Sequence, residues 1–294
     1  MLPNSVIIGA QKAGTTALKL ALKAHPDVDA PRGECPFFED PYYDSDDLGP
    51  LEALFAGSTA SVRVIKRPDY LAHPECAERI HRHLLDVSLV AVLRHPVERA
   101  VSAYFHFVAR GMLPLRGLDN GMRRLLQGDE RPAAQDVLNY GYYHRQLTAY
   151  TNVFPRERLH VIRYEELRFS FGAALHDVQV FLGLDPERMG SLPPLSANES
   201  MYALPRLSVH RLRTRIRSDR DTARGHTHPR TAMRAPARWA SAALHGVDRR
   251  ALARLDSSKP ILAPDLRAEL LERYRDDTDQ LEVWLGVDLS DWKR

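Results

Sequence analysis

The hydrophobic pattern at the N-terminus changes from that of a strand to that of a helix. Residues 5–8 form a short β-branched, apolar run, which favours a buried β-strand. Small residues follow at positions 9–14, and good helix formers predominate from there to residue 22. The predicted order is strand, glycine-containing loop and helix, with Thr15 or Thr16 as the candidate N-cap of the helix.

The same alternation of strand and helix patterns recurs along the chain. The run at residues 88–93 is almost continuously apolar, which is typical of a parallel strand buried on both faces. Strands that alternate with helices predict an α/β fold, with a central parallel sheet flanked by helices. The predicted strands are 5–8, 62–65, 88–93 and 159–162, and the predicted helices are 15–22, 74–85, 96–107, 140–150, 171–182 and 263–285.

One segment departs from this alternation. Residues 205–254 are rich in arginine and poor in β-branched hydrophobic residues. One interpretation is a solvated, helical Arg-rich insertion. The other is a basic lid that attracts an anionic acceptor or covers a cofactor. After this segment, residues 263–285 carry leucine and aromatic side chains at helical spacing, which predicts a helix packed on the core.

The composition fits one globular domain of mixed charge. The chain has 294 residues, of which 44% are hydrophobic, and this is enough to bury a sizeable core. Because no Gly/Ser-rich or Pro-rich linker divides the sequence, we expect a single domain over residues 1–294. Lys and Arg total 41 against 38 Asp and Glu, a net charge of +3, so any basic site must be local.

The N-terminus and the two cysteines indicate the compartment. No basic region precedes an apolar stretch, and no apolar run approaches the roughly 20 residues of a membrane helix. We therefore expect a cytoplasmic protein with no membrane partner. Cys35 and Cys76 lack the spacing of metal ligands. Two unpaired thiols in a reducing compartment are the favoured interpretation, and a single disulfide is the alternative.

A candidate anion-binding loop joins the first predicted strand to its helix. Residues 9–16 read Gly-Ala-Gln-Lys-Ala-Gly-Thr-Thr, with two glycines at the separation found in triphosphatase phosphate loops. Those loops place Lys and then Ser or Thr after the second glycine, whereas this chain has Thr15 and Thr16 there and carries its lysine at Lys12. Backbone amides and the helix dipole still favour an anion. The loop therefore indicates a terminal phosphate-like group without a metal, and a glycine turn required only for packing is the alternative.

A second candidate anion site combines Arg94 with Ser102. Arg94 directly follows the predicted strand 88–93, and ligands of open α/β sheets bind at the carboxyl ends of strands. Ser102 lies two turns into the next predicted helix. The planar fork of arginine and the hydroxyl of serine can both bind phosphate oxygens. For Arg94 taken alone, an ordinary surface ion pair is the alternative.

Together the two segments resemble those of sulfotransferases that use 3′-phosphoadenosine 5′-phosphosulfate (PAPS). The loop fits the pattern G-x-x-K-x-G-T-T, and residues 93–104 fit L-R-x-P-x-x-R-x-x-S-x-Y. The similarity is greatest to the carbohydrate branch, which includes the heparan sulfate enzymes and many bacterial homologues. The resemblance implies that the first segment binds the 5′-phosphosulfate and the second binds the 3′-phosphate. It assigns cofactor contacts to Lys12, Ala13, Gly14, Thr15, Thr16, Arg94 and Ser102.

The resemblance covers most of the chain. Residues 34–38 resemble the family segment E-x-x-F-F, whose glutamate is the proposed base, and residues 66–70 resemble K-x-P-x-Y. Near the C-terminus, Lys259 lies in a segment that resembles the cofactor-closing loop, which makes it a further candidate cofactor contact. Residues 205–254 do not match the eukaryotic glycan enzymes, so the resemblance does not imply the identity of the acceptor.

The implied reaction is an in-line displacement at sulfur, in which charge grows on the surrounding oxygens. Glu34 would accept the acceptor proton, while Lys12 and Lys66 would stabilise the transferring sulfuryl group and the leaving phosphate. No metal is required. The alternatives are His95 or His106 as the base, and ordinary surface roles for Glu34 and Lys66.

Three other functions compete with this interpretation. A P-loop kinase or triphosphatase would need Mg²⁺ and a lysine directly after Gly14. A non-catalytic nucleotide-binding module would tolerate changes at Glu34 and Lys66. Nucleic-acid binding through the Arg-rich segment is disfavoured, because aromatic residues for base stacking are not interleaved there. We therefore predict a PAPS-dependent sulfotransferase acting on a hydroxyl, or alternatively an amine, of a glycan or small-molecule acceptor. The sequence leaves the acceptor and the oligomeric state open.

Overall fold

The computed structural model describes residues 1–191, 201–221, 226–229, 235–248, 252–255 and 259–294. The chain forms two compact units, each built from separate segments. The first unit holds residues 1–96, 142–197 and 276–293, and the second holds residues 97–141, 198–275 and 294. That the two units act as a single domain stays a prediction.

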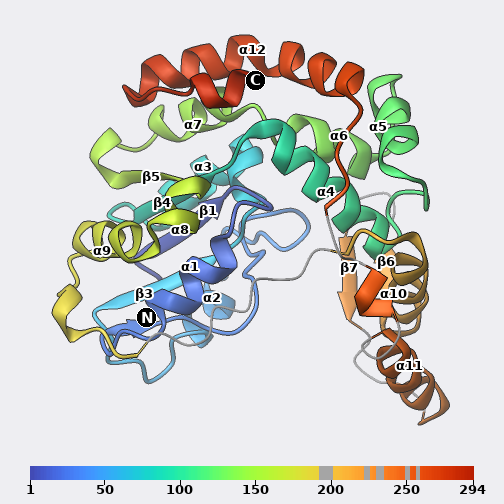
Figure 1. The fold of residues 1–294 in the computed structure, drawn as a ribbon. Helices are drawn as coiled ribbons and strands as arrows, with labels where there is room; N and C mark the ends of the chain where they lie inside the picture. Colours follow the sequence, from blue (N-terminus) through green and yellow to red (C-terminus); the bar gives the residue numbers. More distant parts are fainter. Residues whose placement is uncertain (192–200, 222–225, 230–234, 249–251, 256–258) are drawn as a thin grey trace. The chain divides into compact units, whose positions relative to one another are not determined.

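A five-stranded sheet forms the centre of the first unit (Figure 1). Its strand order is β2-β3-β1-β4-β5, and every neighbouring pair is parallel. In the register of the central strand, Ser5 lies opposite Val64 on one side and Ser88 on the other. The strands are β1 (Ser5–Gly9), β2 (Val28–Asp29), β3 (Val62–Lys66), β4 (Ser88–Leu93) and β5 (Leu159–Arg163). The four predicted strands are confirmed, and β2 is too short to show a pattern in the sequence.

Helices cover both faces of this sheet, as the predicted α/β fold requires. In Figure 1, α1, α8 and α9 lie on one side of the strands, and α3 and α7 lie on the other. Contacts join α1 to α9 and α3 to α7. The helices of this unit are α1 (Thr15–Leu22), α2 (Gly49–Ala53), α3 (Pro74–His83), α7 (Tyr143–Thr151), α8 (Tyr164–Phe169) and α9 (Phe171–Phe181), with 3₁₀ turns η1 (Tyr70–Ala72), η2 (Arg156–Arg158), η3 (Pro186–Arg188) and η6 (Ser290–Lys293).

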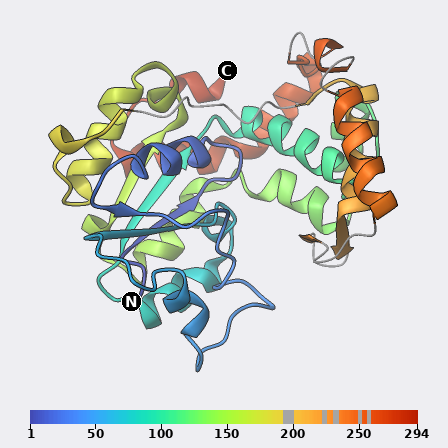
Figure 2. The ribbon, with the colours of Figure 1, turned by 90° about the horizontal axis from the view of Figure 1, so that it is seen from below.

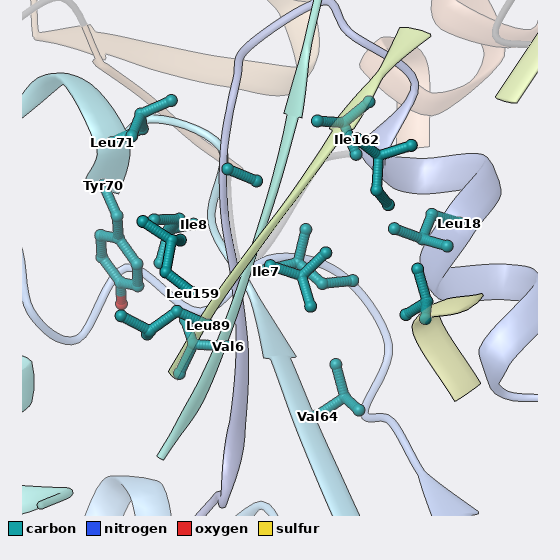
Figure 3. Packing of buried hydrophobic residues seen from close by; sticks show 14 of the residues in the cluster. Val6, Ile7, Ile8, Leu18, Val64, Tyr70, Leu71, Leu89, Leu159 and Ile162 are labelled. Carbon is teal, nitrogen blue, oxygen red and sulfur yellow. The ribbon is translucent and has the colours of Figure 1, made fainter. Parts of the chain in front are cut away.

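The side chains of β1 alternate between two apolar layers. Figure 3 shows Ile8 on the side of Tyr70 and Leu71, whereas Ile7 lies on the side of Leu18. Each of these residues is at most 1% exposed. Full burial of one such aliphatic side chain stabilises the fold by roughly 1.5–3 kcal/mol. The position of β1 is therefore well fixed, and with it the start of the loop that follows Gly9.

The second unit is mainly helical. Helices α10 and α11 contact each other and are drawn in orange shades in Figures 1 and 2. Strands β6 and β7 pair as an antiparallel hairpin. The elements are α4 (Pro96–Arg110), α5 (Leu118–Leu126), α6 (Pro132–Asn139), α10 (Leu204–Arg217), β6 (Ser218–Asp221), β7 (His226–Pro229), α11 (Ala235–Val247), the 3₁₀ turn η5 (Ala253–Leu255) and α12 (Pro264–Leu285), whose C-terminal part belongs to the first unit.

These elements settle part of the prediction for the Arg-rich segment. Its helical character is confirmed by α10 and α11, whereas the hairpin of β6 and β7 was not predicted. Residues 222–225, 230–234 and 249–251 lie outside the described residues. The basic-lid interpretation stays a prediction.

Two further observations concern the whole described chain. Across the residues that the structure describes, no helix is both long and apolar enough to cross a bilayer. Cys35 and Cys76 are free thiols, with Cys76 buried, so the single disulfide left open by the sequence is not formed.

Candidate active site

Two loop segments meet at the carboxyl edge of the sheet. The phosphate loop (residues 9–16) follows β1, and its Ala10 amide donates to the Val92 carbonyl of β4 at 2.7 Å. Residues 34–39, here called the base segment, join the end of β3 through the Cys35 amide, which donates to the Lys66 carbonyl at 3.0 Å. The edge where ligands of such sheets bind therefore carries both predicted motifs of the first unit.

Gly14 shapes the phosphate loop. It occupies the N-cap position of α1 with φ 90°, and a Cβ there would lie 3.2 Å from the Tyr164 ring. No side chain caps the helix, so the prediction that Thr15 or Thr16 is the N-cap was wrong: α1 begins at Thr15 itself. Because the first amides of a helix have no intrahelical acceptor, they favour an anion at this point. The first turn of α1 carries no acidic residue that would compete with such an anion.

Lys66 connects the predicted base to the phosphate loop. Its Nζ donates to Glu34 Oε1 at 2.7 Å and to Thr16 Oγ1 at 3.0 Å. The lysine side chain is 4% exposed and the glutamate side chain 37% exposed. The geometry therefore brings together three residues that the sequence predicted separately. Glu34 is the most exposed of the three, since Thr16 is half-buried and Lys66 is buried.

The ionisation of Glu34 is controlled by its cationic neighbours. Burial raises the pKa of Glu34, but the charges and hydrogen bonds of Lys66 and Arg67 outweigh burial and hold this pKa below its ordinary value. The carboxylate is therefore ionised at neutral pH, which is the state that a proton acceptor needs.

Arg67 belongs to the site, although the sequence analysis did not single it out. Its Nη1 donates to Glu34 Oε2 at 3.0 Å, and its Nε and Nη2 each donate to Glu39 at 2.7 Å. A further ion pair joins Nη2 to Asp69 at 2.9 Å. In the motif K-x-P-x-Y this residue occupies the unspecified second position, so the pattern itself gave no signal for it.

Side chains of α1 and η1 also bind the backbone in and directly before the base segment. The Nζ of Lys19 donates to the carbonyls of Pro31 and Gly33, the latter at 2.6 Å. Burial, together with the charge of Lys66, lowers the pKa of Lys19 to about 8. Tyr70 donates its hydroxyl proton to the Cys35 carbonyl. These contacts restrict the backbone on both sides of Glu34.

Arg94 lies against the phosphate loop. Its Nη1 donates to the Lys12 carbonyl at 3.1 Å, and its guanidinium stacks over the Tyr164 ring at 4.6 Å from the centroid. The carbonyl of Arg94 accepts a hydrogen bond of 2.8 Å from the Tyr143 hydroxyl. Two predicted cofactor residues, Lys12 and Arg94, are thus neighbours, which the separation of 82 positions did not reveal.

The remaining predicted cofactor residues, Ser102 and Lys259, lie in the second unit. Ser102 is buried on α4, with 4% of its surface exposed. Lys259 forms an ion pair with Glu98, which lies on α4 as Ser102 does. Arg267 contacts the same Glu98 carboxylate at 3.1 Å. Their contacts to a cofactor stay predictions. For Lys259 the structure adds a carboxylate partner that the sequence did not indicate.

The histidines proposed as alternative bases have aromatic neighbours. His95 is 7% exposed, and its ring centroid lies 6.4 Å from that of Trp292. His106 packs edge-on against Phe107. Among the described residues, no group of three or more His, Cys, Asp and Glu side chains could hold a metal ion.

Charge is divided unequally between the two units. The first unit has 17 Lys and Arg against 25 Asp and Glu, a formal charge of −8, and the second has 24 against 13, a formal charge of +11. The second unit also has a surface hollow of about 690 Å³ beside α5. One of its arginines, Arg123, pairs with Asp265 at 3.0 Å. The hollow is lined by Arg116, Gly117, Asn120, Arg123, Arg124 and Gln127.

The structure defines an α/β protein with a glycine-containing strand–loop–helix unit, and this loop lacks the lysine of metal-dependent triphosphatases. Comparison with known proteins identifies the family. The model described as "Sulfotransferase domain" matches residues 2–228, and the chain belongs to the sulfotransferase family. The resemblance predicted from the sequence is confirmed.

Individual relatives agree with this assignment. Heparan sulfate glucosamine 3-O-sulfotransferase 6 of Mus musculus is 31% identical over 185 residues, which cover 62% of this chain and 52% of that protein. Bifunctional heparan sulfate N-deacetylase/N-sulfotransferase 2 of Bos taurus is 27% identical over 197 residues, covering 63% and 22%. The chain thus matches about half or less of the length of these curated relatives. A sulfotransferase structure from Alicyclobacillus acidocaldarius, 23% identical with a TM-score of 0.68, covers 100% of both chains and shares the fold.

Proposed function

We propose that the chain transfers a sulfuryl group from PAPS to a hydroxyl of a glycan or small-molecule acceptor. The observation that carries this proposal is the contact of Lys66 with both Glu34 and Thr16, because a carboxylate and an ammonium group then lie beside the loop that follows β1. A kinase is disfavoured by Thr15, which stands where a triphosphatase loop has its lysine.

The residues of the first unit fit a 5′-phosphosulfate. Gly14 keeps the start of α1 open by its positive φ, and the amides from Ala13 to Thr16 suit a tetrahedral anion without a metal. Lys12 and Arg94 lie at the same loop and supply positive charge. By the family resemblance Arg94 would also contact the 3′-phosphate, and the cofactor contacts of Ser102 and Lys259, in the second unit, stay predictions. PAPS supplies, when bound, a sulfuryl group activated by its phosphate leaving group.

The chain's own residues have distinct tasks in this reaction. Glu34 accepts the proton from the acceptor hydroxyl as the new oxygen–sulfur bond forms and the sulfur–oxygen bond to the phosphate breaks. Lys66 and Lys12 stabilise the negative charge that develops on the sulfuryl and phosphate oxygens. Because no proton is needed on the phosphate leaving group, a single carboxylate and two ammonium groups are sufficient.

The charge of the second unit supports an anionic acceptor. Its formal charge of +11, and the arginine-lined hollow beside α5, favour sulfated or carboxylated sugars over neutral ones. Amino groups are the alternative acceptors, because the relatives include both an O-sulfotransferase and an N-sulfotransferase.

The proposal is tested by measuring transfer of ³⁵S from labelled PAPS to matched anionic and neutral glycans. The protein should label acceptors without added metal, and anionic ones preferentially. The preference should decline as salt rises, because ions screen the basic surface. Glu34→Gln should lower the rate by at least about 100-fold, since that is the usual contribution of a general base.

Binding of adenosine 3′,5′-bisphosphate supplies the control. Because Glu34→Gln removes a charge and leaves the loop intact, the affinity of this product analogue should stay within about threefold of the parent. Transfer by Glu34→Gln at near the parental rate would place the base elsewhere. Absence of transfer by the parent protein to every acceptor class would contradict the proposed activity.

A further inference from the structure

Glu34 is bound by two cationic side chains, Lys66 and Arg67, and only the lysine has a role in the reaction proposed above. Building on the proposed function, we propose that Arg67 is a positioning residue that keeps Glu34 in place while Lys66 turns to the transferring sulfuryl group.

The two oxygens of Glu34 are held by different cations. Lys66 contacts Oε1 at 2.7 Å, and Arg67 contacts Oε2 at 3.0 Å. When Lys66 leaves to stabilise charge on the sulfuryl oxygens, Oε1 becomes available to accept the acceptor proton. Oε2 remains bound to Arg67. If Lys66 were the only cation bound to Glu34, the carboxylate would lose its one ion pair during the transfer step.

Arg67 is itself immobilised. Its Nε and Nη2 form a two-pronged contact with Glu39, both bonds 2.7 Å long, and Nη2 also pairs with Asp69 at 2.9 Å. The arginine side chain is 12% exposed and that of Glu39 is 5% exposed. Charge-assisted, bidentate bonds of this kind fix the plane of a guanidinium. Neither partner is free to rotate away without leaving a buried charge.

Arg67 also connects Glu34 to the phosphate loop by a second route. Asp69, which pairs with Arg67, accepts a bond of 2.8 Å from Gln11 of the loop. The first route runs from Glu34 through Lys66 to Thr16. The base is therefore tied to both ends of the loop that binds the donor, so its distance to the reacting group is preserved when one tie opens.

The geometry is specific for arginine. Three carboxylates, those of Glu34, Glu39 and Asp69, surround a single guanidinium. Only a planar group with several donors can contact all three, so lysine at this position keeps the charge and loses the arrangement.

Removal of Arg67 should change the pKa of Glu34 in one direction. The charged groups that face Glu34 are Lys66 at the end of β3, Arg67 directly after it, and Lys19 from α1. Burial raises the pKa of Glu34 and the cations lower it. Loss of Arg67 therefore raises the pKa of Glu34, and the acid limb of the kcat profile moves to higher pH.

The test compares Arg67→Met, Arg67→Lys and a control, Arg79→Gln. Arg79 contacts the Phe38 carbonyl at 2.9 Å and the Asp40 carboxylate, so it supports the same segment away from Glu34. The pKa of Glu34 is read from the ¹³C shift of its carboxylate in glutamate-labelled protein bound to adenosine 3′,5′-bisphosphate. Glu34→Gln identifies the signal.

We expect Arg67→Met to raise this pKa by about one unit or more. It should also lower kcat by about tenfold or more, with KM for PAPS little changed, because a positioning residue acts on the chemical step. Arg67→Lys should keep the pKa near the parental value and still lose kcat. Arg79→Gln should change neither quantity. These different effects of the three variants on pKa and kcat distinguish a positioning role of Arg67 from a general loss of stability.

An unchanged pKa of Glu34 in folded Arg67→Met overturns the inference. If Arg67→Met does not fold, Arg67→Lys decides, and a parental kcat in that variant also overturns it. A parent protein without PAPS-dependent transfer would instead contradict the proposed function. The NMR titration would still report whether Arg67 controls Glu34, so the two failures are distinguishable.

Discussion

Single residues determine the shape of the loop that follows β1, and Gly14 is one of them. Its φ of 90° lies in the left-handed region, which costs an L-residue roughly 1–2 kcal/mol. Its Cα also faces the Tyr164 ring, so a methyl group at this position meets carbon atoms at 3.2 Å. The start of α1 therefore depends on the absence of a side chain.

Gly14→Ala should lower both stability and affinity for the anion. The strain should reduce the free energy of unfolding by about 1–2 kcal/mol, and displacement of the loop amides should weaken adenosine 3′,5′-bisphosphate binding by about tenfold or more. Gly57→Ala is the matched control, because Gly57 has φ 76° with open space around its Cα. It should lose similar stability in a denaturant titration and retain affinity. Equal affinity in the two variants would show that the loop geometry does not determine binding.

The sequence predicted some site residues better than others. Lys12, Lys66 and Glu34 were predicted because each occupies a fixed position in a motif; their roles stay predictions, and the structure shows Lys66 in contact with Glu34. Arg67 was not found, since Glu34 and Glu39 become its partners only when the base segment folds over the end of β3. Such a cluster depends on tertiary contacts and leaves no local pattern.

Whole elements carry these residues into position, and α7 shows how. Its first residue, Tyr143, donates to the Arg94 carbonyl at 2.8 Å. Its first amides are satisfied from a distant element: Asp277 of α12 accepts from His144 and Arg145 at 3.0 and 3.1 Å. The predicted helix at residues 140–150 instead begins at Tyr143, because this cap comes from a residue more than 130 positions away.

Asp277→Ala should destabilise the protein by about 1 kcal/mol, which is the usual cost of losing a helix cap. Asp276→Ala is the control, because that neighbour is exposed on the same helix. It should change the free energy of unfolding by less than about 0.5 kcal/mol. Chemical denaturation measures both variants. A similar effect of the two substitutions would contradict the capping role.

Among the strands, the strongly apolar ones could be predicted from the sequence, whereas the short ones could not. Strands β1, β3 and β4 are largely buried, so their apolar runs predicted them to within a residue, and the half-buried edge strand β5 was predicted to within a residue too. Strand β2, with two residues, is stabilised by pairing with β3 and has no pattern of its own. The hairpin of β6 and β7 contains Asp, Arg and His in place of the β-branched residues expected of strands.

In the whole molecule, the net charge of +3 is the sum of one acidic and one basic unit. The unit that contains the phosphate loop is acidic overall, at −8, and the other is basic, at +11. The composition alone suggested a nearly neutral protein. The division becomes visible only when residues are grouped by unit, because each unit is assembled from separate stretches of sequence. Positive charge gathered in this way raises the local concentration of an anionic partner.

Calorimetric titration with adenosine 3′,5′-bisphosphate, compared with ATP and Mg²⁺, shows which class of nucleotide the chain binds. We expect micromolar binding of the bisphosphate and weak binding of ATP. Arg94→Ala should lower bisphosphate affinity by about tenfold or more, because charge-assisted bonds contribute about 1.5–3 kcal/mol. Arg82→Ala, at an exposed position on α3, is the control and should bind as the parent does. Tight, Mg²⁺-dependent binding of ATP with no preference for the bisphosphate would contradict the account.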